Sequence, residues 1–145
     1  MRDAATALCM RFLPNRDVVG ERPWLGWNVP LHCTDVGLVL LAFAEAEIVD
    51  AALAAPLRRF TPSTVTAPAA IRARLAQIRR AGFVRTREEY MAGVNSVAVP
   101  IRDRLGRTIA ALSMIIPSTV CDDARYDEAV IAAGAAVSAE LGWSS

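Results

Sequence analysis

The order of its segments predicts an α+β domain in which helices pack on a mainly antiparallel sheet. Strand-like residues come first, helical stretches follow, and a hairpin and a last helix close the chain. Its 145 residues correspond to one domain, because so short a chain cannot form two well-packed cores. A hydrophobic share of 54% is enough to bury a real core. We therefore treat residues 1–145 as a single domain.

Composition excludes several classes of protein. The net charge is +1, so neither nucleic acid nor an anionic membrane is expected to bind the chain itself. The three cysteines lack a Cys-x-x-Cys spacing, which argues against a zinc ribbon and a disulfide framework. The longest apolar run, 36–44, is too short to span a bilayer, and the start lacks the pattern of a signal peptide. We expect a cytoplasmic domain with no metal and no cofactor.

Strands are expected near the N-terminus. Leu8, Met10 and Phe12 recur with a period of two, which predicts a strand. Residues 14–17 have the composition of a turn, and Val18 and Val19 begin a second strand-like stretch.

The first helix is predicted from Val36, because apolar residues then recur at helical spacing. Val36, Val39, Leu40 and Phe43 fall on one face, and Thr34 precedes them as a plausible N-cap. A short helical piece over 47–53 is expected to follow.

A longer helix is predicted between Thr66, as its cap, and Gly82, as its C-terminal stop. Ile71, Leu75 and Ile78 line one face, while arginines occupy much of the remaining surface. We interpret these arginines as a solvated helix face, because no aromatic or glycine-rich partner of a nucleic-acid site accompanies them.

A hairpin is the best-defined element of the sequence. Residues 96–101 lead into Asp103-Arg104-Leu105-Gly106, which fits a type I turn, and 107–116 form the return strand. A last helix is expected from Asp122 or Asp123, with a face made of Tyr126, Val130, Val137 and Leu141.

Register decides which hairpin residues meet. A two-residue loop places Ser96 opposite Ser113 and Ala98 opposite Ala111, with Val97 opposite Leu112 on the other, apolar face. The four small side chains then leave a hollow with two hydroxyls, which suits a small molecule. A glycine bulge at Gly106 would shift this register by one. We favour the unshifted register because it separates large from small residues. The alternative is that small residues make room for a closely packed helix.

No catalytic constellation is evident. His32 is the only histidine, and it points away from Cys33 if the segment is extended, so we expect a structural histidine. Glu88 and Glu89 are interpreted as turn carboxylates. We predict that the chain is not an enzyme; a small α/β enzyme using Cys33 or Glu89 is the weaker alternative.

Seven blocks of sequence resemble the IclR family of bacterial transcriptional regulators, in that family's order and spacing. They are residues 29–42, 57–66, 75–83, 88–89 with 93, 96–103, 106 and 110–113. The resemblance is to the family's C-terminal effector-binding domain, a GAF-like sheet flanked by helices. In the family this half follows a winged helix-turn-helix that binds DNA, and we expect no such domain within residues 1–28. The resemblance implies self-association, and DNA binding only through a separate N-terminal domain.

The resemblance also implies a ligand site. Carried over position by position, the family's contacts fall on Val29, Asp35, Val36, Thr86, Ser96, Ser113 and Ile115. Where relatives carry small residues at the helix start, this chain has Asp35 and Val36. A carboxylate there occupies the place that a bound anion would take. We therefore expect a neutral, apolar or aromatic effector, with Trp24 and Trp27 at the entrance. An orphan oligomerisation module, its hollow filled by side chains, is the alternative function.

Overall fold

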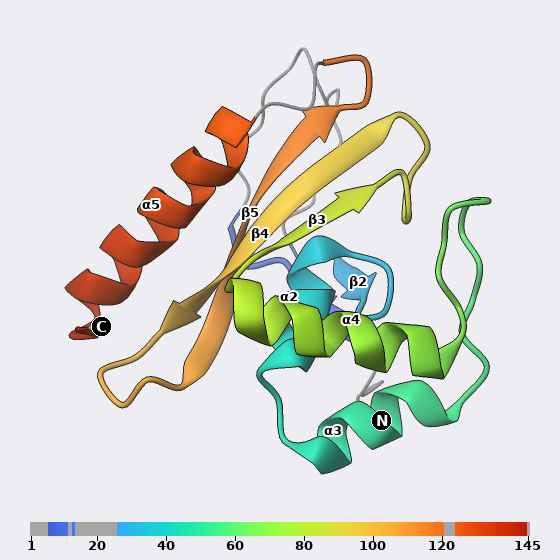
Figure 1. The fold of residues 1–145 in the computed structure, drawn as a ribbon, viewed down its shortest axis with the longest axis horizontal. Helices are drawn as coiled ribbons and strands as arrows, with labels where there is room; N and C mark the ends of the chain where they lie inside the picture. The colour runs from blue at the N-terminus through green and yellow to red at the C-terminus, as the bar shows by residue number, and fades with distance from the viewer. Residues whose placement is uncertain (1–5, 12, 14–25, 121–123, 145) are drawn as a thin grey trace.

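The computed structural model describes residues 6–11, 13, 26–120 and 124–144 (Figure 1). Within them, strands β1 (Thr6–Leu8) and β2 (Asn28–Pro30) form one antiparallel pair. A three-stranded antiparallel sheet has the order β3–β4–β5, with bounds Val84–Arg87, Val94–Arg102 and Thr108–Pro117. The helices are α2 (Asp35–Ala42), α3 (Ala46–Ala54), α4 (Pro68–Ala81) and α5 (Ala124–Glu140). The predicted α+β class, an antiparallel sheet flanked by helices, is confirmed.

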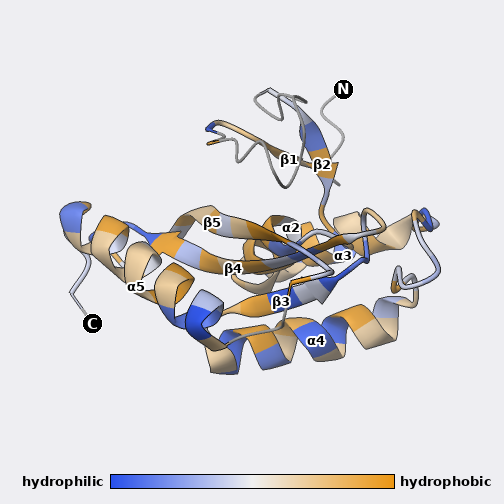
Figure 2. Cartoon of the chain, turned by 90° about the horizontal axis from the view of Figure 1, so that it is seen from above, coloured by the Kyte–Doolittle hydropathy of each residue, from blue (hydrophilic) through white to orange (hydrophobic). Residues whose placement is uncertain are grey.

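The three-stranded sheet is covered on both faces, and the residues of β4 alternate between two cores. Ala98 belongs to the larger core, which includes Leu38 of α2 and Leu75 of α4. Val97 and Val99 belong to a smaller core with Val130 of α5. Figure 2 shows α5 and α4 as separate outer helices on this sheet. The period of two in β4 therefore determines which helix each residue meets.

Helix α2 begins where the sequence predicts. The Thr34 hydroxyl accepts a hydrogen bond from the Gly37 amide at 3.1 Å and donates one to the Pro30 carbonyl oxygen at 2.6 Å. A Cβ on Gly37 would lie 2.4 Å from the Leu31 Cα, so only glycine lets the helix start pack this closely on the preceding loop. Leu38, fully buried, then anchors the helix in the core.

Helix α4 confirms the predicted stripe and the predicted end. Ile71, Leu75 and Ile78 are its buried residues, and Gly82 ends it in the left-handed region with φ of 78°. The predicted cap is wrong, because the N-cap is Ala67 and makes no side-chain bond. The Thr66 hydroxyl instead accepts a hydrogen bond from Arg59 Nη2 at 3.3 Å. Proline at the first helical position compensates, since it has no N–H to satisfy.

The predicted hairpin is present, but its predicted register is wrong by two residues. Ser96 lies opposite Ile115 rather than Ser113, and Ser113 lies opposite Ala98. Likewise, Val97 faces Met114 rather than Leu112, and Ala111 faces Pro100 rather than Ala98.

Two separate irregularities cause this shift. At the turn, the Asp103 amide donates to the Arg107 carbonyl oxygen at 3.0 Å, and Gly106 is left-handed with φ of 76°. A second irregularity follows between Ile101 and Arg102. One shift alone would exchange the two faces of β5, whereas two shifts restore them. Ser96 and Ser113 therefore still share a face, as predicted, although they are not opposite each other.

Helix α5 confirms the predicted burial of Val130, but the rest of its buried face differs from the predicted one. Its buried residues are Val130, Gly134 and Ser138, whereas Val137 and Leu141 are 42% and 44% exposed. The reason is close approach to the sheet, since a Cβ on Gly134 would lie 2.4 Å from Val99 Cγ2. The predicted start, Asp122 or Asp123, lies outside the described residues.

The N-terminal strand is shorter than expected and has the opposite phase. In β1 the buried residue is Ala7, while Leu8 and Met10 are exposed. Pairing with β2 decides this, because Ala7 lies opposite the buried Val29. Phe12 and the expected strand at Val18 and Val19 lie outside the described residues.

Candidate functional site

Four of the seven predicted site residues come together between α2 and the three-stranded sheet. The Thr86 and Ser96 hydroxyl oxygens lie 2.6 Å apart across β3 and β4. The Ser113 hydroxyl of β5 donates a hydrogen bond to Asp35 Oδ2, at the start of α2. We call Asp35, Thr86, Ser96 and Ser113 the polar cluster. It joins one helix to three strands, and three of its four members are buried.

The Asp35 carboxylate occupies the N-terminus of its own helix. Its Oδ1 accepts a hydrogen bond from the Val36 amide at 2.8 Å, which is one of the amides a bound anion would otherwise use. Burial raises the pKa of Asp35 above its ordinary value, while hydrogen bonds from Ser113, Val36 and Ser96 act in the opposite direction. These partners of the carboxyl are hydroxyls and amides, and none of them carries a positive charge that would compensate for its burial.

The other three predicted residues lie around the polar cluster in different ways. Val36 is half-buried and contributes the amide just described. Ile115 is half-buried and lies opposite Ser96, on the face of β5 that carries Ser113. Val29 is buried in β2, and the carbonyl oxygen of the next residue, Pro30, accepts a hydrogen bond from the Thr34 hydroxyl at 2.6 Å. Trp27 is exposed, and Trp24 lies outside the described residues.

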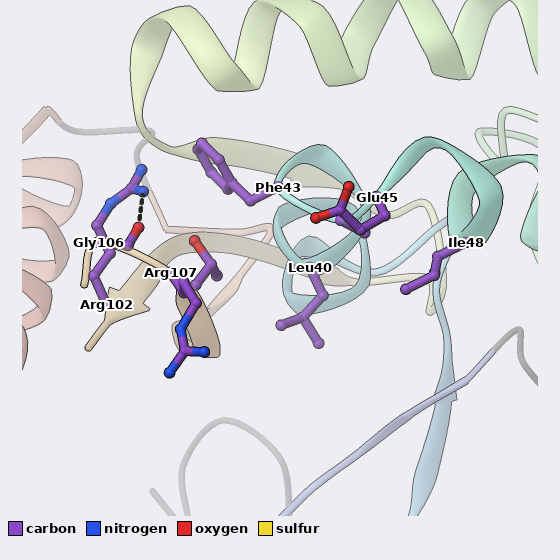
Figure 3. A pocket seen from close by; sticks show the side chains of 9 residues that line it. Leu40, Phe43, Glu45, Ile48, Arg102, Gly106 and Arg107 are labelled. Carbon is purple, nitrogen blue, oxygen red and sulfur yellow. Dashed lines mark hydrogen bonds between the residues drawn. The ribbon is translucent and has the colours of Figure 1, made fainter. Parts of the chain in front are cut away.

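A hollow that the sequence did not indicate lies at the end of α2 opposite to the polar cluster. It measures about 480 Å³, and Figure 3 shows Leu40, Phe43 and Ile48 on one side and the hairpin residues Arg102 and Arg107 on the other. The Arg102 guanidinium lies 4.6 Å from the centre of the Phe43 ring, and its Nη1 donates to the Gly106 carbonyl oxygen at 3.1 Å. Both contacts hold this arginine in the wall, and Glu45, Arg107 and Thr108 also line the hollow, so its surface is partly polar and partly apolar.

The residues considered for catalysis have structural roles. The His32 ring nitrogen Nε2 lies 2.8 Å from the Arg58 carbonyl oxygen. Burial and the charge of Glu89 raise the pKa of Cys33 to about 12, so its thiol is not a nucleophile at neutral pH. Glu89 is paired with Arg74 at 2.6 Å, and Glu88 Oε1 accepts a hydrogen bond from the Gly93 amide at 2.6 Å.

The described part of the chain holds neither a metal cluster nor a helix that could span a membrane. It has no group of three or more His, Cys, Asp or Glu side chains placed to hold a metal ion. Among the same residues, no helix has the length and apolar character needed to cross a membrane.

Comparison with known proteins gives consistent results. Residues 1–139 match the family model described as the bacterial transcriptional regulator IclR C-terminal domain. The chain is 37% identical over 123 residues to the HTH-type transcriptional regulator XynR of Escherichia coli, covering 82% of this chain and 49% of that protein. It thus spans about half the length of this curated relative.

Two solved structures are also similar. An IclR homologue from Microbacterium hydrocarbonoxydans, in complex with 4-hydroxybenzoate, is 33% identical with a TM-score of 0.86, covering 94% of this chain and 56% of that one. The C-terminal domain of the E. coli regulator KdgR is 32% identical with a TM-score of 0.75, covering 82% and 75%.

Proposed function

Because the chain belongs to the IclR family of bacterial transcriptional regulators and matches its C-terminal part, we propose that it binds a small-molecule effector and thereby controls transcription. Its relatives are regulators rather than enzymes. Control would follow from differential binding, since an effector shifts a conformational equilibrium only by preferring one state. DNA binding belongs to a separate N-terminal domain, and the domain self-associates and works in the cytoplasm.

The polar cluster is the observation that carries this proposal. A ligand that hydrogen-bonds to Ser113 competes with the bond between Ser113 and Asp35, and one that hydrogen-bonds to Ser96 competes with the contact between Ser96 and Thr86. The bond between Ser113 and Asp35 connects β5 to the start of α2. Replacing it with a contact to the ligand would change the position of α2 relative to the sheet. Val29, Val36, Thr86 and Ile115 complete the proposed lining of the effector site.

We propose a neutral, apolar or aromatic effector. The Val36 amide already donates to Asp35 Oδ1, so it is not available to a carboxylate of the ligand. The 4-hydroxybenzoate found in the M. hydrocarbonoxydans relative is an aromatic acid. We expect the effector of this chain to contain an aromatic ring, and we expect a carboxylate on the ligand to be disfavoured next to Asp35.

A matched pair of probes tests the effector class. Methyl 4-hydroxybenzoate and 4-hydroxybenzoate share a ring and a phenol, but only the second carries a carboxylate. We expect the ester to raise the melting temperature by several degrees at about 100 times its Kd, where binding adds about 2.7 kcal/mol. A panel of aromatic compounds and small metabolites extends the screen. Stabilisation by small carboxylates alone would contradict the proposed class.

Two variants locate the binding. Ser113→Ala removes the hydroxyl of β5 and is expected to reduce the ligand-induced shift, whereas Ser63→Ala, at an exposed loop serine, leaves the shift unchanged. Asp35→Asn removes the carboxylate, so it is expected to improve the binding of 4-hydroxybenzoate relative to the ester. If Ser113→Ala and Ser63→Ala bind every hit as the wild type does, the polar cluster is not the effector site.

A further inference from the structure

The central part of the outward face of α5 lacks the charged residues that normally cover a solvated helix. Residues 129–139 contain no charged side chain. Three of them, Val130, Gly134 and Ser138, are buried against the sheet. The other eight are all exposed: Ala129, Ile131, Ala132, Ala133, Ala135, Ala136, Val137 and Ala139. A helix face of this length and composition is typical of a contact surface rather than of a surface in water.

The centre of this face is a stripe of alanines opposite the buried stripe. Ala129, Ala132, Ala136 and Ala139 recur at intervals of three and four residues, so they align along the helix. Figure 1 shows α5 on the outside of the sheet, with no described element over it. Small side chains let a second helix approach to the short end of the usual range, about 8 Å between axes. We call Ala129, Ala132, Ala136 and Ala139 the alanine stripe.

Charges at the two ends of the alanine stripe favour a second copy of the same helix as its partner. Arg125 lies near the start of α5 and Glu140 at its end, and both are exposed; Glu128, one residue before the stripe, is exposed as well. In an antiparallel pair of identical helices, Arg125 of each copy lies beside Glu140 of the other, and the helix dipoles oppose each other. A parallel pair would place like charges together. Of these two arrangements, the antiparallel one with a two-fold axis brings Arg125 and Glu140 together at both ends, and two-fold symmetry is that of most homodimers.

We propose that α5 packs antiparallel against α5 of a second copy of this chain, about a two-fold axis near Ala132 and Ala133. The inference rests on the proposed self-association, to which it assigns a surface. It is independent of the effector site, because α5 and the polar cluster lie on opposite faces of the sheet. Helix α5 has 17 residues and is about 25 Å long, so the contact is small beside interfaces of roughly 1,200–2,000 Å². The dimer therefore dissociates on dilution.

A charge in the centre of the stripe tests the surface. Ala132→Glu places two carboxylates beside the axis and is expected to weaken dimerisation at least tenfold in sedimentation velocity over a concentration series. Ala73→Glu is the matched control, since Ala73 is an exposed alanine in the middle of α4. It is expected to leave the dimer unchanged. Circular dichroism and thermal melting check that both variants are folded.

A charge swap tests the antiparallel arrangement. Arg125→Glu and Glu140→Arg are each expected to weaken the dimer several-fold at low salt, because each creates two like-charge contacts. The double variant restores the pairing with the signs exchanged and is expected to regain wild-type affinity. A general loss of helix stability would not be rescued in this way.

The outcomes separate this surface from the rest of the proposed function. A wild-type chain that stays monomeric up to millimolar concentration overturns the dimer, and a dimer that tolerates Ala132→Glu overturns the surface while leaving self-association intact. Failure of the charge rescue overturns the antiparallel geometry. None of these results affects the ligand-induced melting shift, which tests effector binding separately.

Discussion

Helices α4 and α5 both pack on the domain core through three residues at intervals of three or four, yet they are built differently. In α4 the three are large, Ile71, Leu75 and Ile78, and arginines cover much of the outer surface. In α5 they include Gly134 and Ser138, and the outer surface is mostly alanine. The comparison shows that α4 has one apolar face, which is buried, whereas α5 has a second apolar face that none of the described residues covers.

The two helices also meet different surfaces. Helix α4 fills space with side-chain volume, packing with α2 in the larger core. Helix α5 lies so close that Gly134 contacts Val99, and the Ser138 hydroxyl accepts a hydrogen bond from the Arg102 amide at 3.0 Å. This amide lies at the irregularity between β4 and β5. Large buried side chains stabilise the packing of α4, whereas a close approach of the backbone to the sheet stabilises the packing of α5. Each helix is therefore tested by a different kind of substitution.

The largest expected effect comes from removing volume under α4. Leu75 is 1% exposed, so Leu75→Ala is expected to lower the free energy of unfolding by about 3 kcal/mol through lost burial and the cavity left behind. Urea unfolding measures it, with the exposed Gln77→Ala as control. A loss below about 1 kcal/mol would mean that the core around α4 closes the cavity.

Adding volume under α5 tests its close fit. Gly134→Leu forces a side chain into the space of Val99, and we expect a loss of about 2 kcal/mol even though leucine favours the helix more than glycine does. Ala135→Leu adds the same side chain at the exposed neighbouring position and is expected to change stability little. Equal stability of the two variants would contradict the proposed importance of the close contact.

The buried Asp35 carboxyl at the start of α2 predicts that the free energy of unfolding depends on pH, an effect that the uncharged central part of the outer face of α5 does not contribute. Because the pKa of Asp35 is raised in the folded chain, the folded state binds its proton more tightly than the unfolded state. Stability from this group is therefore fully present below the ordinary value of 3.8 and declines as the pH rises through the raised pKa. Asp35→Asn should remove this decline. Unfolding curves from pH 4 to pH 7 for both proteins test it, and parallel curves would contradict it.

The smallest effects on stability are expected from removing the arginines of two ion pairs, one that involves α5 and one that involves α4. Arg85 Nε and Asp127 Oδ1 are 2.7 Å apart, with side chains 21% and 17% exposed, and they link β3 to α5. Arg72 and Asp50 are also 2.7 Å apart but 48% and 65% exposed. We expect Arg85→Ala to cost about 1 kcal/mol and Arg72→Ala a few tenths, because water screens the exposed pair. Chemical denaturation of both variants compares them directly, and the reverse order would contradict this explanation.

Local patterns in the sequence were enough to predict much of the fold and the candidate site. Thr34 as the cap of α2, the buried stripe of α4 and its end at Gly82 were all predicted, since each depends on residues within a few positions. The shared face of Ser96 and Ser113 followed from the period of two. Family resemblance added Asp35 and Thr86, which the structure brings to the same cluster.

Contacts between distant segments decided the rest. The register of β5 depends on two irregularities near the turn, and no local pattern distinguishes one shift from two. The buried face of α5 depends on how closely the helix approaches Val99, so glycine and serine are covered while Val137 and Leu141 are exposed.

The sequence by itself thus determined which segments form helices and strands and which strand residues share a face, because hydrophobic periodicity and helix caps act over a few residues. Only the tertiary structure decided which residues lie opposite each other, where the Asp35 carboxylate points and which side of α5 remains uncovered. Those features depend on packing between segments that are far apart in the chain. Side-chain volume and hydrogen-bond partners at the contact, rather than local preference, select among the arrangements that the same pattern allows.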